Sequence, residues 1–282
     1  MHRFLLIAAF SFAPTASADD PGQRPHPAPS DRYGLLAIND QYYDLSANTG
    51  GDFYFWAPGE FANAGLQLPI HDEGVLLSYG RLDGPARSFT IPVESGARAL
   101  TIFSGIQRKD LVALIRPDGS SVAAGASDAQ LQSFRYMTIA TIKSPEPGAW
   151  RLLLTGVGKY AVTAHVKPGN GGTAPAFQDF DFVQLGGRPG HEGWFPIRRE
   201  LRKGETIECS AEVAGRVSAV AFTFVTRDDR PIATAPLQAE GDDGEYFGRC
   251  VIPNVPFRVA VSGRDETGRP FRRVESGLNS PK

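Results

Sequence analysis

The residues that could carry catalysis are few and scattered along the chain. Beyond the N-terminal leader, histidine occurs only as His26, His71, His165 and His191, and no Gly-x-Ser-x-Gly nucleophile motif is present. His165 shares a strand face with Thr163, which predicts a solvated surface histidine. A catalytic triad would have to be built around His71 or His191, and no local motif supports one. A hydrolase with an unrecognised site is therefore the weakest functional hypothesis.

The acidic clusters and the remaining histidines match no complete metal motif. His191-Glu192 lacks the second histidine of the helical zinc-protease motif and stands among glycines. Asp242-Asp243-Gly244-Glu245 resembles a fragment of a calcium loop without EF-hand spacing, so a solvated acidic turn is favoured, as it is for Asp228-Asp229. His71-Asp72-Glu73 is a compact polar triplet and makes only a weak case for a metal site. We expect no metal and no cofactor, with calcium near Asp242-Asp243 left as an open alternative.

An aromatic-rich segment is the best candidate for a ligand-binding surface. Around the turn Asn48-Thr49-Gly50-Gly51 stand six aromatic residues: Tyr42, Tyr43, Phe53, Tyr54, Phe55 and Trp56. If residues 52–56 form a strand, Phe53 and Phe55 are buried and Tyr54 and Trp56 lie on the opposite face. Rings exposed there, with Tyr42 and Tyr43, could stack on sugars. Burial is the favoured alternative, because apolar burial stabilises by about 25 cal/mol per Å².

A run of basic residues is a second candidate surface. It comprises Arg198, Arg199, Arg202 and Lys203, and Arg272 and Arg273 could join it in the fold. Phosphate or a sulfated glycan could bind there. The neighbouring Glu200, Glu205 and Glu208 favour a solvated face of mixed charge instead.

The two cysteines, Cys209 and Cys250, are expected to form a disulfide, since paired thiols are the rule in oxidising compartments. The alternatives are two separate thiols or zinc ligation, and two cysteines without nearby histidines make a poor zinc site. Cys209 lies in the alternating run 206–213. Cys250 lies in the strand before the penultimate one, 257–264, so the bond should join neighbouring strands and not cross the core as in antibody domains. Its loss is predicted to weaken the C-terminal half without unfolding the other half.

The N-terminus carries the features of an export signal. Arg3 precedes an apolar run at 4–13, and Ala16-Ser17-Ala18 is a small-x-small cleavage pattern, so we expect cleavage after Ala18 and a periplasmic or extracellular protein. The apolar run is too short to span a membrane. Without the leader, 28 basic and 31 acidic residues remain, which argues against nucleic acid as a partner.

Short alternating runs between glycine- and proline-rich turns predict an all-β protein of two tandem β-sandwich domains, the C-terminal one Ig-like. Inward faces are expected at Phe89, Ile91 and Val93, and at Phe257, Val259 and Val261, with Arg258 on the polar side. The apolar run 111–115 should be a central strand.

The predicted boundaries are a signal peptide (1–18), a Pro-rich lead-in (19–31), an aromatic segment packing on the first sandwich (32–82), the first sandwich (83–168), a linker (169–177), the Ig-like domain (178–276) and a tail (277–282). In the Ig-like domain, strands are predicted near 178–184, 194–198, 205–213, 217–226, 245–251, 257–264 and 270–274.

Residues 83–282 resemble the tail region of hemicentin and of proteins with a von Willebrand factor A domain, in which a β-sandwich precedes an Ig-like domain. The matching stretches are 99–102 (ALTI), 116–119 (RPDG), 144–150 (SPEPGAW), 256–265 (PFRVAVSGRD) and 271–274 (FRRV). The A domain itself is missing: no Asp-x-Ser-x-Ser metal-adhesion motif is present, and residues 19–82 are too few to form it. The resemblance implies an extracellular scaffold with no active site to transfer.

Together these observations predict an exported, non-catalytic interaction module that binds a protein or cell-surface partner. The alternative is a carbohydrate-binding or enzyme-accessory protein that uses the aromatic segment 42–56. Neither the identity of the partner nor the oligomeric state follows from the residues.

Overall fold

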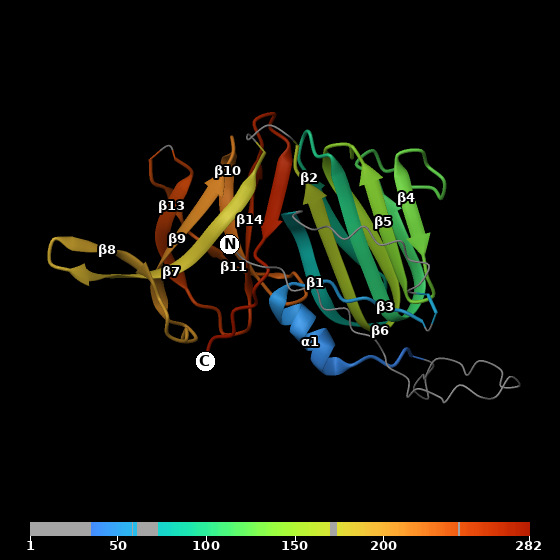
Figure 1. Ribbon diagram of the computed structural model, residues 1–282, viewed down its shortest axis with the longest axis horizontal. Helices are drawn as coiled ribbons and strands as arrows, with labels where there is room; N and C mark the ends of the chain where they lie inside the picture. The colour runs from blue at the N-terminus through green and yellow to red at the C-terminus, as the bar shows by residue number, and fades with distance from the viewer. Residues whose placement is uncertain (1–34, 58, 61–72, 170–173, 242) are drawn as a thin grey trace, which may run out of the picture.

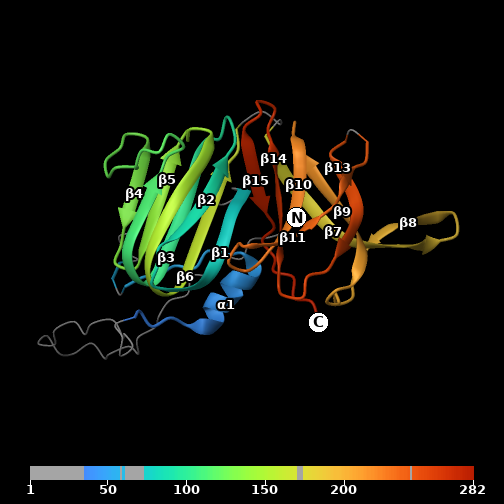
Figure 2. The same ribbon diagram turned by 180° about the vertical axis from the view of Figure 1, so that it is seen from behind.

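The computed structural model describes residues 35–57, 59–60, 73–169, 174–241 and 243–282, and this part of the chain is almost entirely β-structure (Figure 1 and Figure 2). The predicted all-β fold class is confirmed. The signal peptide, the lead-in, His26, His71, Asp72 and Asp242 lie outside the described residues. Within the described part, no helix is long and apolar enough to cross a membrane.

The first half of the described chain forms one antiparallel sheet of six strands. These are β1 (Glu73–Asp83), β2 (Arg87–Val93), β3 (Ala99–Ile115), β4 (Ala129–Ser133), β5 (Met137–Lys143) and β6 (Gly148–Lys167). Their spatial order is β1-β6-β3-β5-β4, and β2 pairs with the first part of β6, before the part that pairs with β1. The sheet therefore starts at Glu73, earlier than the boundary at residue 83 expected from the sequence.

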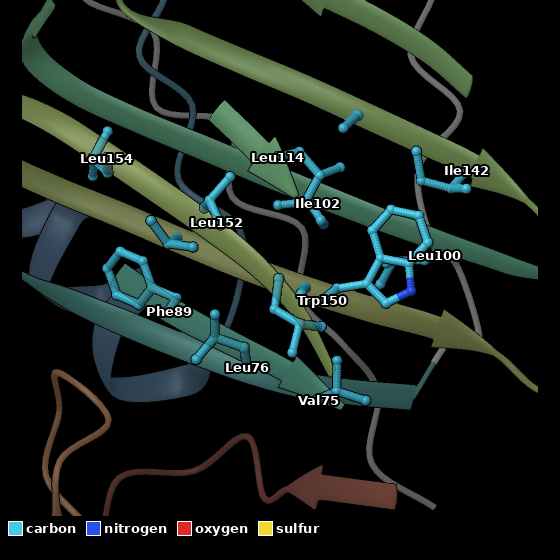
Figure 3. Packing of buried hydrophobic residues seen from close by; sticks show 14 of the residues in the cluster. Val75, Leu76, Phe89, Leu100, Ile102, Leu114, Ile142, Trp150, Leu152 and Leu154 are labelled. Carbon is cyan, nitrogen blue, oxygen red and sulfur yellow. The ribbon is translucent and has the colours of Figure 1, made fainter. Parts of the chain in front are cut away.

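One face of this sheet carries a large apolar core (Figure 3). Figure 3 shows Trp150, Leu152 and Leu154 of β6 on the same side of the sheet as Phe89 of β2, with Trp150 beside Leu100, and all five side chains are buried. The alternation that placed Phe89, Ile91 and Val93 on one inward face is confirmed. The run 111–115 lies in β3, but the expectation that this run is a central strand is wrong: β3 pairs with β5 only from Ala99 to Gly105, so the run has β6 as its one neighbouring strand, and only Leu114 in it is buried.

The opposite face is covered along part of its length by the aromatic segment. Helix α1 (Asp40–Thr49) begins at Asn39, whose side chain accepts hydrogen bonds from the backbone N–H groups of Gln41 and Tyr42. The segment 51–57 then crosses the sheet without forming a strand, and Phe55 packs so close to Gly105 that any side chain there would collide with its ring. As a result β6 is buried on both faces from Tyr160 to Val166, whereas it alternates before that.

The second half contains two sheets. One has the order β11 (Pro231–Ala235), β10 (Ser218–Val225), β14 (Arg258–Arg264) and β15 (Pro270–Val274). The other has the order β12 (Gln238–Ala239), β13 (Glu245–Val251), β9 (Thr206–Ala214), β7 (Ala176–Arg188) and β8 (His191–Pro196). Phe180 and Phe182 of β7 share a buried cluster with Phe222 of β10, so residues of the two sheets meet in one core. All seven strands predicted here are present, and β11 and β12 were not anticipated.

Cys209 and Cys250 form a disulfide, as predicted. Their strands, β9 and β13, are neighbours in one sheet, so the bond is a staple within the sheet and not a bridge between sheets. Both cysteines are buried in the core of the second half.

The two halves share an apolar cluster. It combines Tyr43, Leu77 and Tyr79 from the first half with Val225 and Ala260 from the second. In both views β15 lies beside β1 and β2, and α1 runs beneath the junction (Figure 1 and Figure 2). Contact with the first half explains why β14 is buried on both faces from Arg258 to Val261.

Arg258 was expected on a polar, solvent-facing side of its strand, and that prediction is wrong. The side chain is fully buried at the junction of the two halves. Its guanidinium donates hydrogen bonds to the carbonyl oxygens of Ala47 and Ser276. Because Ala47 lies in the last turn of α1, a cation there satisfies a helix C-terminus and interacts favourably with the helix dipole.

The expected participation of Arg272 and Arg273 in a basic surface patch is also wrong. Arg273 is 1% exposed, and its guanidinium pairs with the fully buried carboxylate of Glu94 at 2.5 Å. Arg272 pairs with Asp229 and donates to the carbonyl oxygen of Val75. Both arginines are therefore held at the junction, where their partners compensate the cost of burying the charges.

Candidate functional site

A projecting β-hairpin is the most exposed apolar feature of the described chain. Strand β7 pairs with β9 only as far as Val183, and beyond that point it pairs only with β8. Figure 1 shows this two-stranded arm extending away from the rest of the molecule, on the side opposite the first half. We call residues 184–196 the arm. The two strands of the arm come so close at Gly187 that any side chain there would collide with the carbonyl oxygen of His191.

The arm presents large apolar side chains to solvent. Leu185 is 66% exposed, Trp194 is 48% exposed and Phe195 is 46% exposed. Leu185 and Trp194 are cross-strand partners, so they lie on one face, and Phe195 lies on the other. A two-stranded ribbon has little core of its own, and clustered exposed apolar groups with unpaired strand edges mark interaction sites.

The sequence prediction missed the arm as a surface. Residues 194–198 were predicted only as one of the seven strands of the second domain, with no exposed surface assigned to them. The available signal was the Gly-Gly-Arg-Pro-Gly-His-Glu-Gly stretch before it, which is too rich in glycine to pack against a core on either face. Such a stretch between two apolar residues is typical of a solvent-exposed hairpin.

The predicted aromatic binding face does not form. Residues 53–55 are all buried, with Tyr54 only 4% exposed, so the strand alternation expected for this segment is wrong. Tyr43 is 2% exposed and donates hydrogen bonds to the carbonyl oxygens of Gly80 and Tyr160. Trp56 is half-buried and stacks on Tyr54, whereas Tyr42 on α1 is 45% exposed. Close packing of the segment on β3 and β6 leaves no ring face of Tyr54 for a sugar.

His165 is buried, contrary to the surface position expected for it. Thr163 donates a hydrogen bond to the Asp52 carboxylate, and Nε2 of His165 lies 3.2 Å from the same carboxylate oxygen. The face shared by Thr163 and His165 was predicted correctly, but residues 51–57 cover it. All three side chains are less than one tenth exposed, so this group stabilises the contact between segment and sheet and has no open face for a substrate.

The other sequence candidates are dispersed. His191 is exposed at the start of β8, and Arg199 pairs with Glu205 at the surface. Asp228 pairs with Arg87, so Asp228-Asp229 is part of the junction and not a plain solvated turn. Among the described residues, no three histidine, cysteine or carboxylate side chains are placed to hold one metal ion.

Glu275 is a buried acid with a strongly shifted titration. Burial raises the pKa of its carboxyl to about 7, and the nearby Asp179 and Asp181 add to the shift, while Arg258 opposes it. One carboxyl oxygen is buried without a hydrogen-bond partner among the described residues. The folded state therefore favours the protonated form.

Replacing Glu275 with glutamine is expected to remove a pH-dependent loss of stability. The unfolded chain releases this proton near pH 4.5, so the wild type loses up to about 3 kcal/mol as pH rises from about 5 to 8. The check is urea unfolding of wild type and Glu275→Gln at pH 5.5 and 8.5. Glu205→Gln is the control, since the pKa of Glu205 is lowered by Arg199 and lies below this window. Parallel pH profiles for all three proteins would contradict the prediction.

Comparison with known proteins identifies no family. No protein-family model and no curated protein sequence matches the chain. Two solved structures show distant likeness. The Bacillus licheniformis lipase BlEst2 in its propeptide form is 11% identical, with a TM-score of 0.30, over 72% of this chain and 43% of that one. A chimeric titin Z1Z2 carrying a KLER peptide from decorin is 14% identical, with a TM-score of 0.23, over 75% of this chain and 98% of that one. The chain thus spans less than half the length of the lipase, and neither likeness is close enough to argue from.

Proposed function

We propose that the protein is an exported, non-catalytic interaction module whose arm binds a partner protein. The observation that carries the proposal is the exposure of Leu185, Trp194 and Phe195 on a ribbon that projects from a large, well-packed body. Leaving this much apolar surface in water costs free energy, which a partner that covers it would recover.

Other features support the same proposal. The disulfide suits an oxidising compartment, in agreement with the expected leader. The sequence predicts an Ig-like second domain, and its resemblance to the hemicentin tail implies an extracellular scaffold.

The test is site-specific photo-crosslinking in the cell of origin. Benzoylphenylalanine at position 195 is expected to give one discrete protein adduct, and the same group at the exposed Arg151 of the first half is expected to give none. The purified adduct partner should bind wild-type protein, and Leu185→Ser/Phe195→Ser should weaken this binding at least tenfold. The proposal would be refuted if positions 195 and 151 gave equal adducts, or if the partner bound wild type and Leu185→Ser/Phe195→Ser with equal affinity.

The carbohydrate-binding alternative receives no support from the aromatic segment. Tyr54→Ala is expected to act on stability, because Tyr54 contacts Phe103 and Trp56 within the apolar cluster shared by the halves.

A further inference from the structure

The outer face of the five-stranded sheet β12-β13-β9-β7-β8 carries a groove next to the arm. It has a volume of about 380 Å³, and its lining includes the carboxylates of Asp179, Glu212, Glu240 and Glu245 and the rings of Trp194 and Phe247. Trp194 belongs to the arm, so the groove and the exposed apolar face of the arm are continuous. A partner bound to the arm would reach the groove.

Strand register brings like charges side by side in this groove. Glu212 of β9 is the direct cross-strand partner of Asp179 on β7 and of Glu245 on β13, so three carboxylates form one row. Glu240 adds a fourth carboxylate to the lining of the groove. Directly opposed like charges destabilise a sheet. The row therefore has an energetic cost in the free protein that a bound cation would remove.

Among the described residues that line the groove, none is basic. In the described chain, Glu212, Glu240 and Glu245 form no ion pair. The ion pair of Arg249 with Glu208 occupies a row farther along the sheet. Burial is the main cause of the raised pKa of Glu275, and the nearby carboxylates of Asp179 and Asp181 raise it further.

The end of the groove toward the arm is aromatic. The rings of Trp194 and Phe247 lie 4.9 Å apart at 46°, and Trp194 is about half exposed. A cation over an indole face gains cation–π attraction, and tryptophan is the strongest such partner. Carboxylates together with an exposed indole suit an organic cation with a planar, weakly hydrated head, which is the chemistry of arginine.

We propose that this groove binds an arginine-containing segment of the partner protein, with guanidinium groups between the carboxylate row and Trp194. The inference rests on the proposed function, because the arm supplies one wall of the groove. It adds the chemistry of the partner: basic residues next to an apolar contact. Charge complementarity of this kind sets partner choice and speeds association.

The test uses defined peptides with the full-length exported protein. A fluorescein-labelled tetra-arginine peptide is expected to bind measurably in 20 mM salt and at least tenfold more weakly in 300 mM salt, since screening weakens exposed charge contacts. Tetra-glutamate should not bind. Glu212→Gln/Glu245→Gln should weaken tetra-arginine binding at least tenfold, and Trp194→Ala by about fivefold.

A charge-matched control separates the groove from overall net charge. Asp110→Asn/Glu146→Gln removes two exposed carboxylates from the first half and should leave peptide affinity within twofold. The groove variant should also melt at or above the wild-type temperature, because it relieves like-charge repulsion. A lower melting temperature for Glu212→Gln/Glu245→Gln would contradict the repulsive row.

Three outcomes would overturn the inference: no binding of tetra-arginine, an equal loss in both charge variants, or displacement of the peptide by 1 mM calcium, which would indicate a metal site. Failure here leaves the crosslinking test intact, since adduct formation at position 195 does not require a basic partner. Loss of the arm adduct with retained peptide binding would instead refute the proposed function.

Discussion

Glu94→Ala is expected to lower the free energy of unfolding by about 3 to 5 kcal/mol, the usual cost of breaking a fully buried ion pair from one side. Glu94 and Arg273 are at most 1% exposed, and the Arg273 guanidinium also donates to the carbonyl oxygen of Pro175. Removing the carboxylate leaves a buried cation with only neutral acceptors and the more distant Glu73, 3.5 Å away. The measurement is urea unfolding at pH 7.

Two further variants test the physical reason for that loss. Glu94→Met/Arg273→Met removes both charges and should recover more than half of the stability lost in Glu94→Ala, because no unpaired charge stays buried. Arg81→Ala breaks an exposed ion pair with Asp83 and should cost less than about 1 kcal/mol. If Glu94→Ala lowers the free energy of unfolding by no more than Arg81→Ala does, water reaches the junction and the Glu94–Arg273 pair does not stabilise the contact between the two halves.

Removing the disulfide by Cys209→Ala/Cys250→Ala is expected to cost up to about 4 kcal/mol, the chain-entropy value for cysteines this far apart. The two residues are separated by 41 positions, so the bond closes a long loop in the unfolded chain. For a protein of this size such a loss lowers the melting temperature by roughly 8 to 16 °C. Calorimetry with and without reductant is the measurement. The double variant should be insensitive to reductant, whereas the wild type should lose stability in it.

The structure changes one expectation about the disulfide. The sequence predicted that its loss would weaken the C-terminal half alone. However, Val225 and Ala260 of that half pack in one apolar cluster with Leu77 and Tyr79 of the first half. We therefore expect both halves to unfold in one transition in the variant. Two well-separated calorimetric transitions would show that the junction is too weak to couple them.

Much of the fold could be predicted from the sequence because antiparallel strands with one buried face leave a period of two in the chain. Ile207, Cys209, Ala211 and Val213 alternate with polar residues, and all four are buried. The disulfide between neighbouring strands followed from the order of those strands. The breaks between strands could also be predicted, because glycine, proline, asparagine and aspartate favour turn conformations by their own backbone preferences.

The arm could not be placed by the same argument. Trp194 and Phe195 are as apolar as core residues, and only the absence of a third strand beside the end of β7 leaves them in solvent. The acidic row likewise depends on register, since Asp179, Glu212 and Glu245 come from three separate strands.

The sequence by itself determined the strand period, the all-β class and the cysteine pairing, because each depends on side-chain types close together in the chain or on strand order. Only the tertiary structure decided which polar faces are covered. His165 and Arg258 stand on the polar sides of their strands, yet both are buried, because residues 51–57 and the other half of the molecule pack over them. The arm and its acidic groove are exposed because no other described segment packs against them. Whether a strand face is buried depends on the segment that packs on it, and that segment can come from anywhere in the chain.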